Sequence, residues 1–304
     1  MKRSWIALGA VVVVIVVAIV LLLRPRKPSV TAPPEPSPKV STETPPEPPT
    51  KPGEEPAKGP VEPPKKVEPV DADAVLSKAD EELAAGKTVD AYRTLSNALL
   101  SDPKAKRGEE IRSRLVKLSE EAFFAGKVVA PFAVLYKVVA GDSLIKVAGK
   151  HKTTVELLRR INGIKGDILR IGQNLKIVPG GFDVAVDKSD FHLTVTKDGF
   201  WVREFRIGLG KNGTTPVGEF VAGHKLREPV YAAVYPPVPF GDKKNNPLGT
   251  RWITVQAEYG IHGTWEPDAI GKEESKGCVR MANQDVEWLF DLVVPGHSKI
   301  VIRP

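Results

Sequence analysis

The chain has 304 residues, and its hydrophobic and polar positions change character several times along it. Trp5 to Leu23 is an apolar run without a charged residue. As a helix it would span about 28 Å, close to the hydrocarbon thickness of a bilayer. The run ends in leucines followed by Arg-Pro-Arg-Lys, which offers no small-residue cleavage site of the kind that signal peptides carry. Residues 1–24 are therefore predicted to be a retained membrane anchor.

Residues 25–70 have the opposite character. They contain 16 of the 28 prolines of the chain, many charged residues and almost no large apolar side chains. Such a composition cannot bury a core and favours an extended tether. A set of proline motifs that bind recognition modules is the alternative to a plain spacer.

Residues 71–130 have a helical pattern. Apolar residues recur at spacings of three and four within residues 74–85, 89–100 and 109–125, with Gly, Asp-Pro or Gly breaks between them. The sequence Leu-Ala-Ala-Gly-Lys87 is echoed 40 residues later as Phe-Phe-Ala-Gly-Lys127. This resembles a tetratricopeptide-like helical hairpin. Both a spacer bundle and a groove for a protein partner remain open.

Residues 134–179 predict a small strand–helix–helix–strand unit. An alternating strand at 135–139 leads into a turn, and Ser143 or Asp142 can cap a helix that begins at Leu144. A second helix is expected at 154–161, followed by a last strand at 174–178.

The order of motifs in this unit resembles the LysM module over its whole length. The matching runs are Tyr136–Leu144, Thr153–Leu158, Asn162-Gly163 and Ile171–Ile177. The resemblance implies binding of peptidoglycan or another N-acetylglucosamine-containing glycan. A small domain that has lost its ligand is the alternative. The glycan-binding residues that it implies are Gly141, Asp142, Ser143, Leu144 and Asn162.

Residues 181–304 are rich in strands, with β-branched or alternating runs separated by Asp-Gly and Asn-Gly turns. The one clear helix is expected at 284–292. A mainly β, mostly antiparallel sandwich or barrel fits this pattern. The fold class is therefore multidomain: a short helical segment, a βααβ module and a mainly β domain.

The charge and the single cysteine limit the chemistry. The formal net charge is +7, and residues 134–179 alone contribute nine Lys or Arg against three Asp or Glu. A local basic module favours an acidic wall polymer over nucleic acid, since no basic stripe with stacking aromatics occurs elsewhere. One cysteine excludes an intrachain disulfide and a Cys-rich zinc site. No metal and no cofactor are predicted.

The stretch around Cys278 carries the candidate chemistry. A thiolate nucleophile needs a neighbouring cation or imidazole, and His262 can supply it if a turn between two strands brings the two residues together. Gly277 permits unusual backbone angles, and its N–H could point at an oxyanion. Lys276 and Arg280 add positive charge. The alternative is a buried structural cysteine and a structural histidine.

This stretch, with its surroundings, resembles the L,D-transpeptidase catalytic domain (YkuD-like) from about Phe182 to Arg303. The matching runs are Gly210–Phe220, Asn246–Trp252, Gly260–Thr264, Ile270-Gly271, Ser275–Met281 and Asn283–Asp285. The family implies cysteine acyl transfer on peptidoglycan stems, with release of D-alanine and formation of 3→3 crosslinks.

The resemblance also implies roles for individual residues. Cys278 is the nucleophile, His262 the general base and acid, and the carbonyl of Gly263 orients the imidazole. Gly277 would donate to the oxyanion. Substrate contacts are implied for Ser275, Lys276, Arg280 and Asn283. Many members have histidine where this chain has Lys276, so the pH profile is expected to depend on His262 alone.

We therefore expect a single-pass membrane protein whose body is extracytoplasmic, where it acts on peptidoglycan as an L,D-transpeptidase. An L,D-carboxypeptidase and a non-catalytic wall-binding scaffold are the alternatives.

Overall fold

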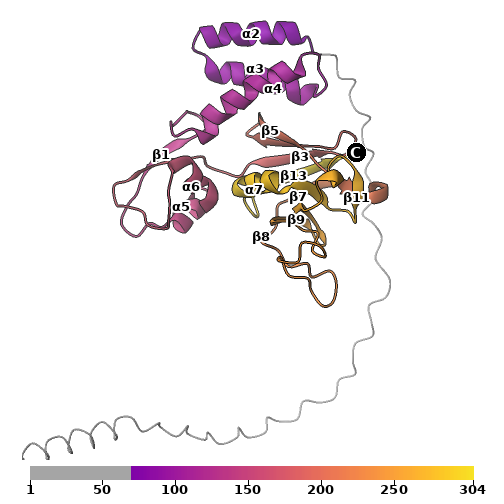
Figure 1. Cartoon of the computed structure of the whole chain (residues 1–304). Coiled ribbons are helices and arrows are strands. Elements are labelled where there is room, and N and C mark those ends of the chain that lie inside the picture. The colour runs from indigo at the N-terminus through magenta and orange to yellow at the C-terminus, as the bar shows by residue number, and fades with distance from the viewer. Residues whose placement is uncertain (1–69) are drawn as a thin grey trace, which may run out of the picture. The chain divides into compact units, whose positions relative to one another are not determined.

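The computed structural model of the chain describes residues 70–304 (Figure 1). The predicted anchor at 1–24 and the proline-rich linker, apart from Val70, lie outside the described residues. Within residues 70–304, none of the helices has the length and apolar character needed to cross a bilayer.

The helical segment contains the three predicted helices. Asp71 caps the first, because its carboxylate accepts the backbone N–H groups of Asp73 and Ala74 at 3.1 Å. The third helix continues directly into a π-helical turn, η1. The spacing of apolar residues, which follows the 3.6-residue period of an α-helix, does not predict this turn. The elements are α2 (Ala72–Ala84), α3 (Thr88–Ser101), α4 (Gly108–Ser119) and η1 (Glu120–Phe124).

The next region has the predicted βααβ order. Its strands pair antiparallel, with Tyr136 opposite Leu175. Leu158, Leu175 and Ile177 lie at the centre of a small core of its own. The elements are β1 (Val134–Lys137), α5 (Leu144–Lys150), α6 (Val155–Asn162) and β2 (Asn174–Ile177).

The C-terminal region is mainly β, as predicted, and contains two larger sheets. The first has the order β5-β4-β3-β13-β7. Strand β13 lies parallel to β3, so the last strand of the chain is inserted beside the first strand of the region. The strands are β3 (Asp183–Asp187), β4 (His192–Lys197), β5 (Phe200–Arg206), β7 (Gly218–Val221) and β13 (Lys299–Arg303).

The second sheet has the order β12-β10-β9-β8, and α7 packs against three of its four strands, β9, β10 and β12. A short parallel pair, β6 with β11, adjoins this sheet, because Gly208 exchanges backbone hydrogen bonds with Arg280 of β12. The elements are β6 (Leu209–Gly210), β8 (Lys225–Arg227), β9 (Arg251–Gln256), β10 (Tyr259–Thr264), β11 (Glu273–Ser275), β12 (Val279–Ala282) and α7 (Asn283–Leu292).

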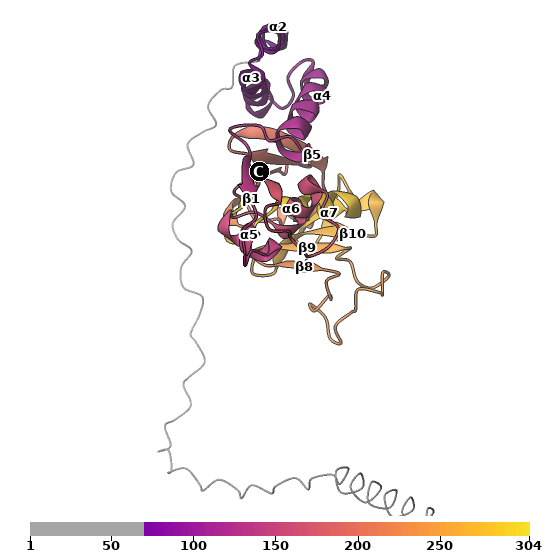
Figure 2. The same cartoon turned by 90° about the vertical axis from the view of Figure 1, so that its left-hand side faces the viewer.

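The helical segment is joined to the C-terminal β region by a shared core. One hydrophobic cluster includes Tyr92 and Leu95 of α3, Leu157 of α6 and Trp201 of β5. Helices α3 and α4 lie along β5, an edge strand of the first sheet (Figure 2). The Trp201 N–H donates to Ser96 Oγ at 3.1 Å, and the Tyr92 hydroxyl donates to the Trp201 carbonyl at 2.6 Å. The helices thus satisfy backbone groups that an edge strand leaves unpaired.

Candidate active site

The second sheet brings His262 and Cys278 to the same face. Strand β10 lies parallel to β12, with Ile261 opposite Val279 and His262 opposite Arg280. Cys278 directly precedes β12, so it aligns with Gly260, two residues from His262. Because side chains alternate between faces, Cys278 and His262 are diagonal neighbours on one face. The prediction that a turn between two strands brings Cys278 and His262 together is wrong. The chain crosses over through β11 between β10 and β12, and these two strands are therefore parallel.

The loop before Cys278 has a conformation that only glycine adopts easily. Gly277 has a φ of +131°, and a Cβ there would lie 2.3 Å from the ring of Tyr259. The Ser275 hydroxyl donates to the Cys278 carbonyl at 2.7 Å and accepts the Gly277 N–H at 3.1 Å. A single buried hydroxyl therefore fixes both ends of the loop that presents the thiol.

A second loop supports this one from behind. A Cβ on Gly210 would lie 2.6 Å from Cα of Gly277, so the two backbones are in direct contact. The Gly210 N–H donates to Thr215 Oγ1 at 2.8 Å. The Lys188 ammonium donates to the carbonyls of Gly213 and Thr215 at 3.1 and 2.8 Å. Lys188 thus ties the supporting loop to the end of β3.

His262 is held in one tautomer. Its Nδ1 lies 2.6 Å from the Gly263 carbonyl, which can only accept a hydrogen bond, so the proton is on Nδ1 and Nε2 keeps its lone pair. Burial lowers the pKa of His262 to about 4; the hydrogen bond to the Gly263 carbonyl opposes this, and the charge of Arg280 adds a smaller lowering. At neutral pH the imidazole is therefore an uncharged base.

Cys278 is the only cysteine of the chain and is partly buried. Burial raises the pKa of its thiol, and the Arg280 charge opposes that rise. Arg280 is itself paired with Glu266 at 3.0 Å. The resting site is therefore a neutral thiol beside a neutral imidazole.

Two of the residues expected to contact substrate or oxyanion have other roles. Ser275 is only 4% exposed and uses its hydroxyl within the loop, and its predicted contact with substrate stays a prediction. The Gly277 N–H donates to that hydroxyl and does not face an open site. Lys276 is exposed. Asn283 accepts the Thr250 N–H at 3.0 Å and so orders the chain beside Gly263.

Some of the predicted glycan-binding residues are exposed or shape the turn, and others are buried or hydrogen-bonded within the module. Gly141 has a φ of +85° and is exposed, as a turn requires, and Ser143 caps α5. Asp142 accepts from the Tyr136 hydroxyl and the Val139 N–H. Leu144 is 3% exposed, and the Asn162 amide is bonded to the backbone of Leu158 and Lys176. Leu144 and Asn162 thus serve the packing of the module, and a contact from either side chain to a glycan stays a prediction.

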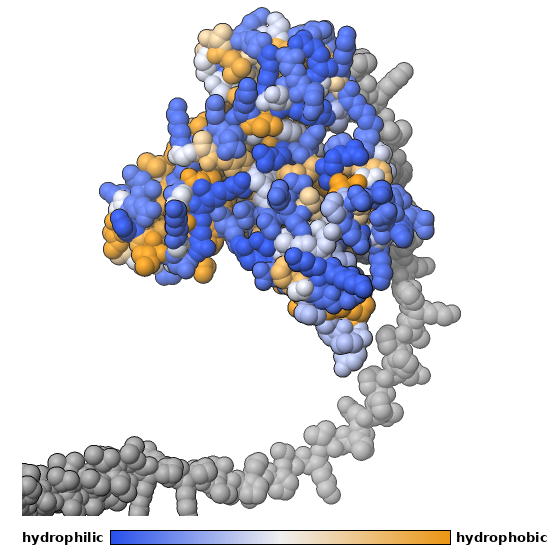
Figure 3. Space-filling model, in the orientation of Figure 1, coloured by the Kyte–Doolittle hydropathy of each residue, from blue (hydrophilic) through white to orange (hydrophobic). Residues whose placement is uncertain are grey.

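The same turns display side chains that the sequence motifs did not single out. Figure 3 shows a hydrophobic patch over this region, and its most exposed apolar residues are Ile145, Ile168 and Ile171. They flank the predicted binding turns. Ile168 and Ile171 lie in a loop, where polar residues are usual, and Ile145 lies in the first turn of α5.

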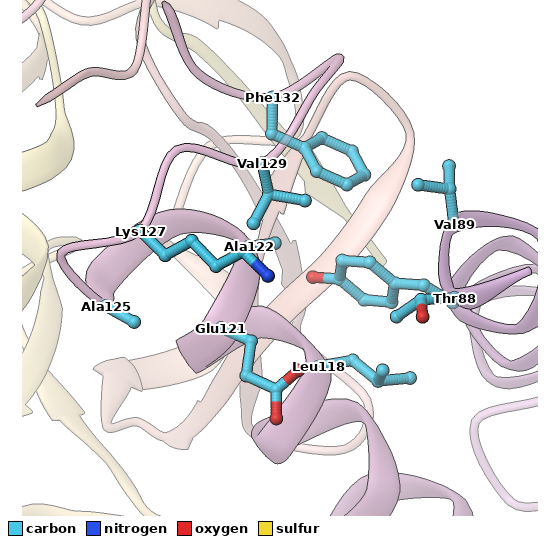
Figure 4. Close-up of a pocket in the computed structure, with 10 residues that line it drawn as sticks. Thr88, Val89, Leu118, Glu121, Ala122, Ala125, Lys127, Val129 and Phe132 are labelled. Carbon is cyan, nitrogen blue, oxygen red and sulfur yellow. The ribbon is translucent and has the colours of Figure 1, made fainter. Parts of the chain in front are cut away.

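A separate hollow of about 320 Å³ lies within the helical segment (Figure 4). Val89, Leu118 and Phe132 give it apolar walls, and Glu121 and Lys127 lie at its edge. None of the residues that line it belongs to the motifs around Cys278. Whether this segment receives a protein partner stays a prediction.

The geometry defines a class of site: a thiol and an oriented, uncharged imidazole on adjacent strands, in a chain that also contains a small βααβ module. Comparison with known families agrees with that description. Residues 182–302 match the L,D-transpeptidase catalytic domain, and residues 136–178 match the LysM domain.

Two curated relatives are each matched over nearly their whole length. The chain is 32% identical over 181 residues to the L,D-transpeptidase YkuD of Bacillus licheniformis, covering 56% of this chain and 99% of that protein. It is 31% identical to YkuD of Bacillus subtilis over 177 residues, 55% of this chain and 98% of the relative. A solved L,D-transpeptidase of Mycobacterium smegmatis is similar over 44% of this chain and 65% of its own, at 21% identity and a TM-score of 0.35.

The chain therefore belongs to the L,D-transpeptidase family, in a form that also carries a LysM domain. The helical segment lies outside both matched domains.

Proposed function

We propose that this chain is a peptidoglycan L,D-transpeptidase that forms 3→3 crosslinks through Cys278. The observation that carries the proposal is the diagonal placement of Cys278 beside His262, whose tautomer leaves Nε2 free to accept a proton. The family membership supplies the reaction class, and the LysM domain supplies peptidoglycan as the polymer.

The first half-reaction consumes the donor. His262 Nε2 takes the thiol proton as Cys278 Sγ attacks the carbonyl of the third residue of a tetrapeptide stem. The Cys278 N–H is the proposed donor to the oxyanion, because the Gly277 N–H is already bonded to Ser275. The bond to D-alanine then breaks, and the imidazolium returns its proton to the leaving amine. A thioester on Cys278 remains.

The second half-reaction consumes the acceptor. An amine on the third residue of a neighbouring stem attacks the thioester, His262 takes the amine proton, and the Cys278 thiolate leaves and regains that proton. Water in place of the amine would give an L,D-carboxypeptidase. The neutral resting pair fits this sequence, since the proton moves only as the bond to sulfur forms.

The LysM and catalytic domains indicate an extracytoplasmic cell-wall protein. We propose that the apolar run within residues 1–24 anchors it to the membrane and that residues 25–70 carry the body into the wall. We also propose that residues 71–130, which resemble a tetratricopeptide-like helical hairpin, bind a protein partner.

The test is incubation of the purified chain with disaccharide tetrapeptides, followed by mass spectrometry. We expect D-alanine release, a new 3→3 dimer and a thioester adduct on Cys278. Cys278→Ala should abolish all three products, and His262→Gln should lower the rate at least about 100-fold because general-base catalysis is lost. Trimmed monomer without dimer would identify a carboxypeptidase, and no acyl-enzyme at all would sink the proposal.

A further inference from the structure

His262 has an aromatic neighbour that the reaction scheme does not use. Trp252 lies directly opposite His262 across the β9–β10 pair. The centroids of the two rings are 5.7 Å apart, and their planes differ by only 14°. The indole therefore lies parallel to the imidazole and next to it on the face that carries Cys278.

Gly260 makes room for this arrangement. A Cβ at Gly260 would lie 2.5 to 2.8 Å from three carbon atoms of the Trp252 ring. Any larger residue at position 260 would push the indole off the strand. Gly260 is also the residue aligned with Cys278, so the indole extends over the part of β10 that lies between the base and the nucleophile.

A hydrogen-bond chain holds the indole from its other end. The indole N–H, which can only donate, points to Thr254 Oγ1 at 2.9 Å. Since Thr254 accepts this bond, its own hydroxyl proton is free for His224, whose ring nitrogens lie 3.2 Å away. The Thr254 N–H also donates to the His224 carbonyl at 3.0 Å. Trp252 is therefore fixed by Thr254 and His224.

We propose that Trp252 is a positioning residue for His262: its indole fixes the plane of the imidazole toward Cys278 and keeps water from that face. The proposal rests on the proposed function, in which His262 is the base. A flat aromatic ring suits this role because it covers the imidazole without offering it a hydrogen bond. Thr254 and His224 act one step further out by holding the indole.

The charged groups around His262 are few. On β12 the guanidinium of Arg280 faces it and is paired with Glu266. On β9, Trp252 and Thr254 are uncharged, and Arg251 is paired with Glu287 of α7 at 3.9 Å. Asp285 of α7 interacts with Arg203. Loss of the indole would therefore act on His262 mainly through hydration.

The decisive measurement is the pKa of His262, followed by NMR of its imidazole in the full chain. His262→Gln identifies its signal among the five histidines. Trp252→Ala should raise the pKa from about 4 toward the ordinary value of about 6.5, because water would then reach the ring and stabilise its charged form. Trp252→Phe, which keeps an aromatic face, should leave the pKa within about one unit of the original.

Two further variants separate stacking from simple burial. Trp252→Leu excludes water but cannot stack, so it should keep a low pKa yet lower kcat about 10-fold through a misplaced ring. Thr254→Val removes the contact to the indole N–H and should give a smaller decrease. KM should stay unchanged in both, since neither residue is proposed to bind substrate.

An unchanged His262 pKa in a folded Trp252→Ala variant, or an equal loss of kcat in the Phe and Leu variants, would overturn the proposal. If Trp252→Ala does not fold, the comparison of Phe with Leu decides the matter alone. A shifted pKa in a chain without transpeptidase activity would refute the proposed function and leave this contact intact.

Discussion

At the scale of single residues, the environment of His262 and Cys278 keeps both groups uncharged in the resting site. His262 is 3% exposed, and its Nδ1–H is committed to the Gly263 carbonyl. Burial works in opposite directions on the two partners, lowering the pKa of the imidazole and raising that of the thiol. Both shifts favour the neutral pair over an ion pair.

The buried imidazole has a consequence for stability in acid. Its folded pKa of about 4 lies below the value of about 6.5 expected when unfolded, so the unfolded chain binds the extra proton first. The free energy of unfolding should therefore fall as the pH drops from about 6.5 to about 4, by up to about 3 kcal/mol from this group.

Urea unfolding at a series of pH values measures this effect, with His262→Gln as the comparison because glutamine does not titrate. The difference between the two proteins should change across this window and level off above it. A constant difference from pH 4 to pH 7 would contradict the assignment of a buried, neutral His262.

At the scale of elements, one buried lysine of the LysM domain helps to hold the end of the helical segment. Lys176 of β2 is 2% exposed, and its ammonium donates to the carbonyls of Ala122 and Ala125 at 3.1 and 2.7 Å. These carbonyls belong to the end of η1, where a helix carries partial negative charge. Burial lowers the pKa of Lys176 to about 8, and the nearby Glu120 opposes this.

Replacing Lys176 by methionine should release this contact. The stem of the side chain would still fill its space, but two carbonyls would lose their donor at a cost of about 1–3 kcal/mol. Hydrogen exchange should become faster in α4 and η1, with little change in β10 and β12. Lys165→Met, at an exposed lysine of the same domain, is the control and should change neither.

These elements also mark what the sequence can and cannot predict. The helices of residues 71–130 and the LysM order follow from local periodicity, and Cys278 with His262 follows from their motif. The parallel pairing of β10 with β12 does not, because it joins strands across an intervening loop and is set by tertiary packing. The burial of Lys176 and Ser275 does not follow from the sequence either. A polar side chain can be buried only where hydrogen-bond partners await it. The partners of Lys176 are about 50 residues away in the chain, and those of Ser275 lie in an irregular loop.

At the scale of the whole molecule, the helical segment and the catalytic domain share a core, while the LysM domain keeps part of its own. Leu95 of α3 belongs to the shared cluster, and Leu158 of α6 belongs to the separate LysM cluster. Both leucines are fully buried at 0% exposure. They form a matched pair for asking which parts unfold together.

Leu95→Ala should destabilise the catalytic domain although it lies outside it. Truncating a buried leucine costs about 2–5 kcal/mol, and a shared core passes that cost to everything that unfolds with it. We expect one calorimetric transition at a lower temperature, with the amide protons of β10 and β12 losing their protection from hydrogen exchange at that same temperature. Leu158→Ala should instead loosen the LysM domain first, so that β10 and β12 stay protected through the early part of melting. If Leu95→Ala gave an early transition that left β10 and β12 protected, the helical segment would be an independent unit, and its contacts to Trp201 would contribute little to holding the active-site sheets together.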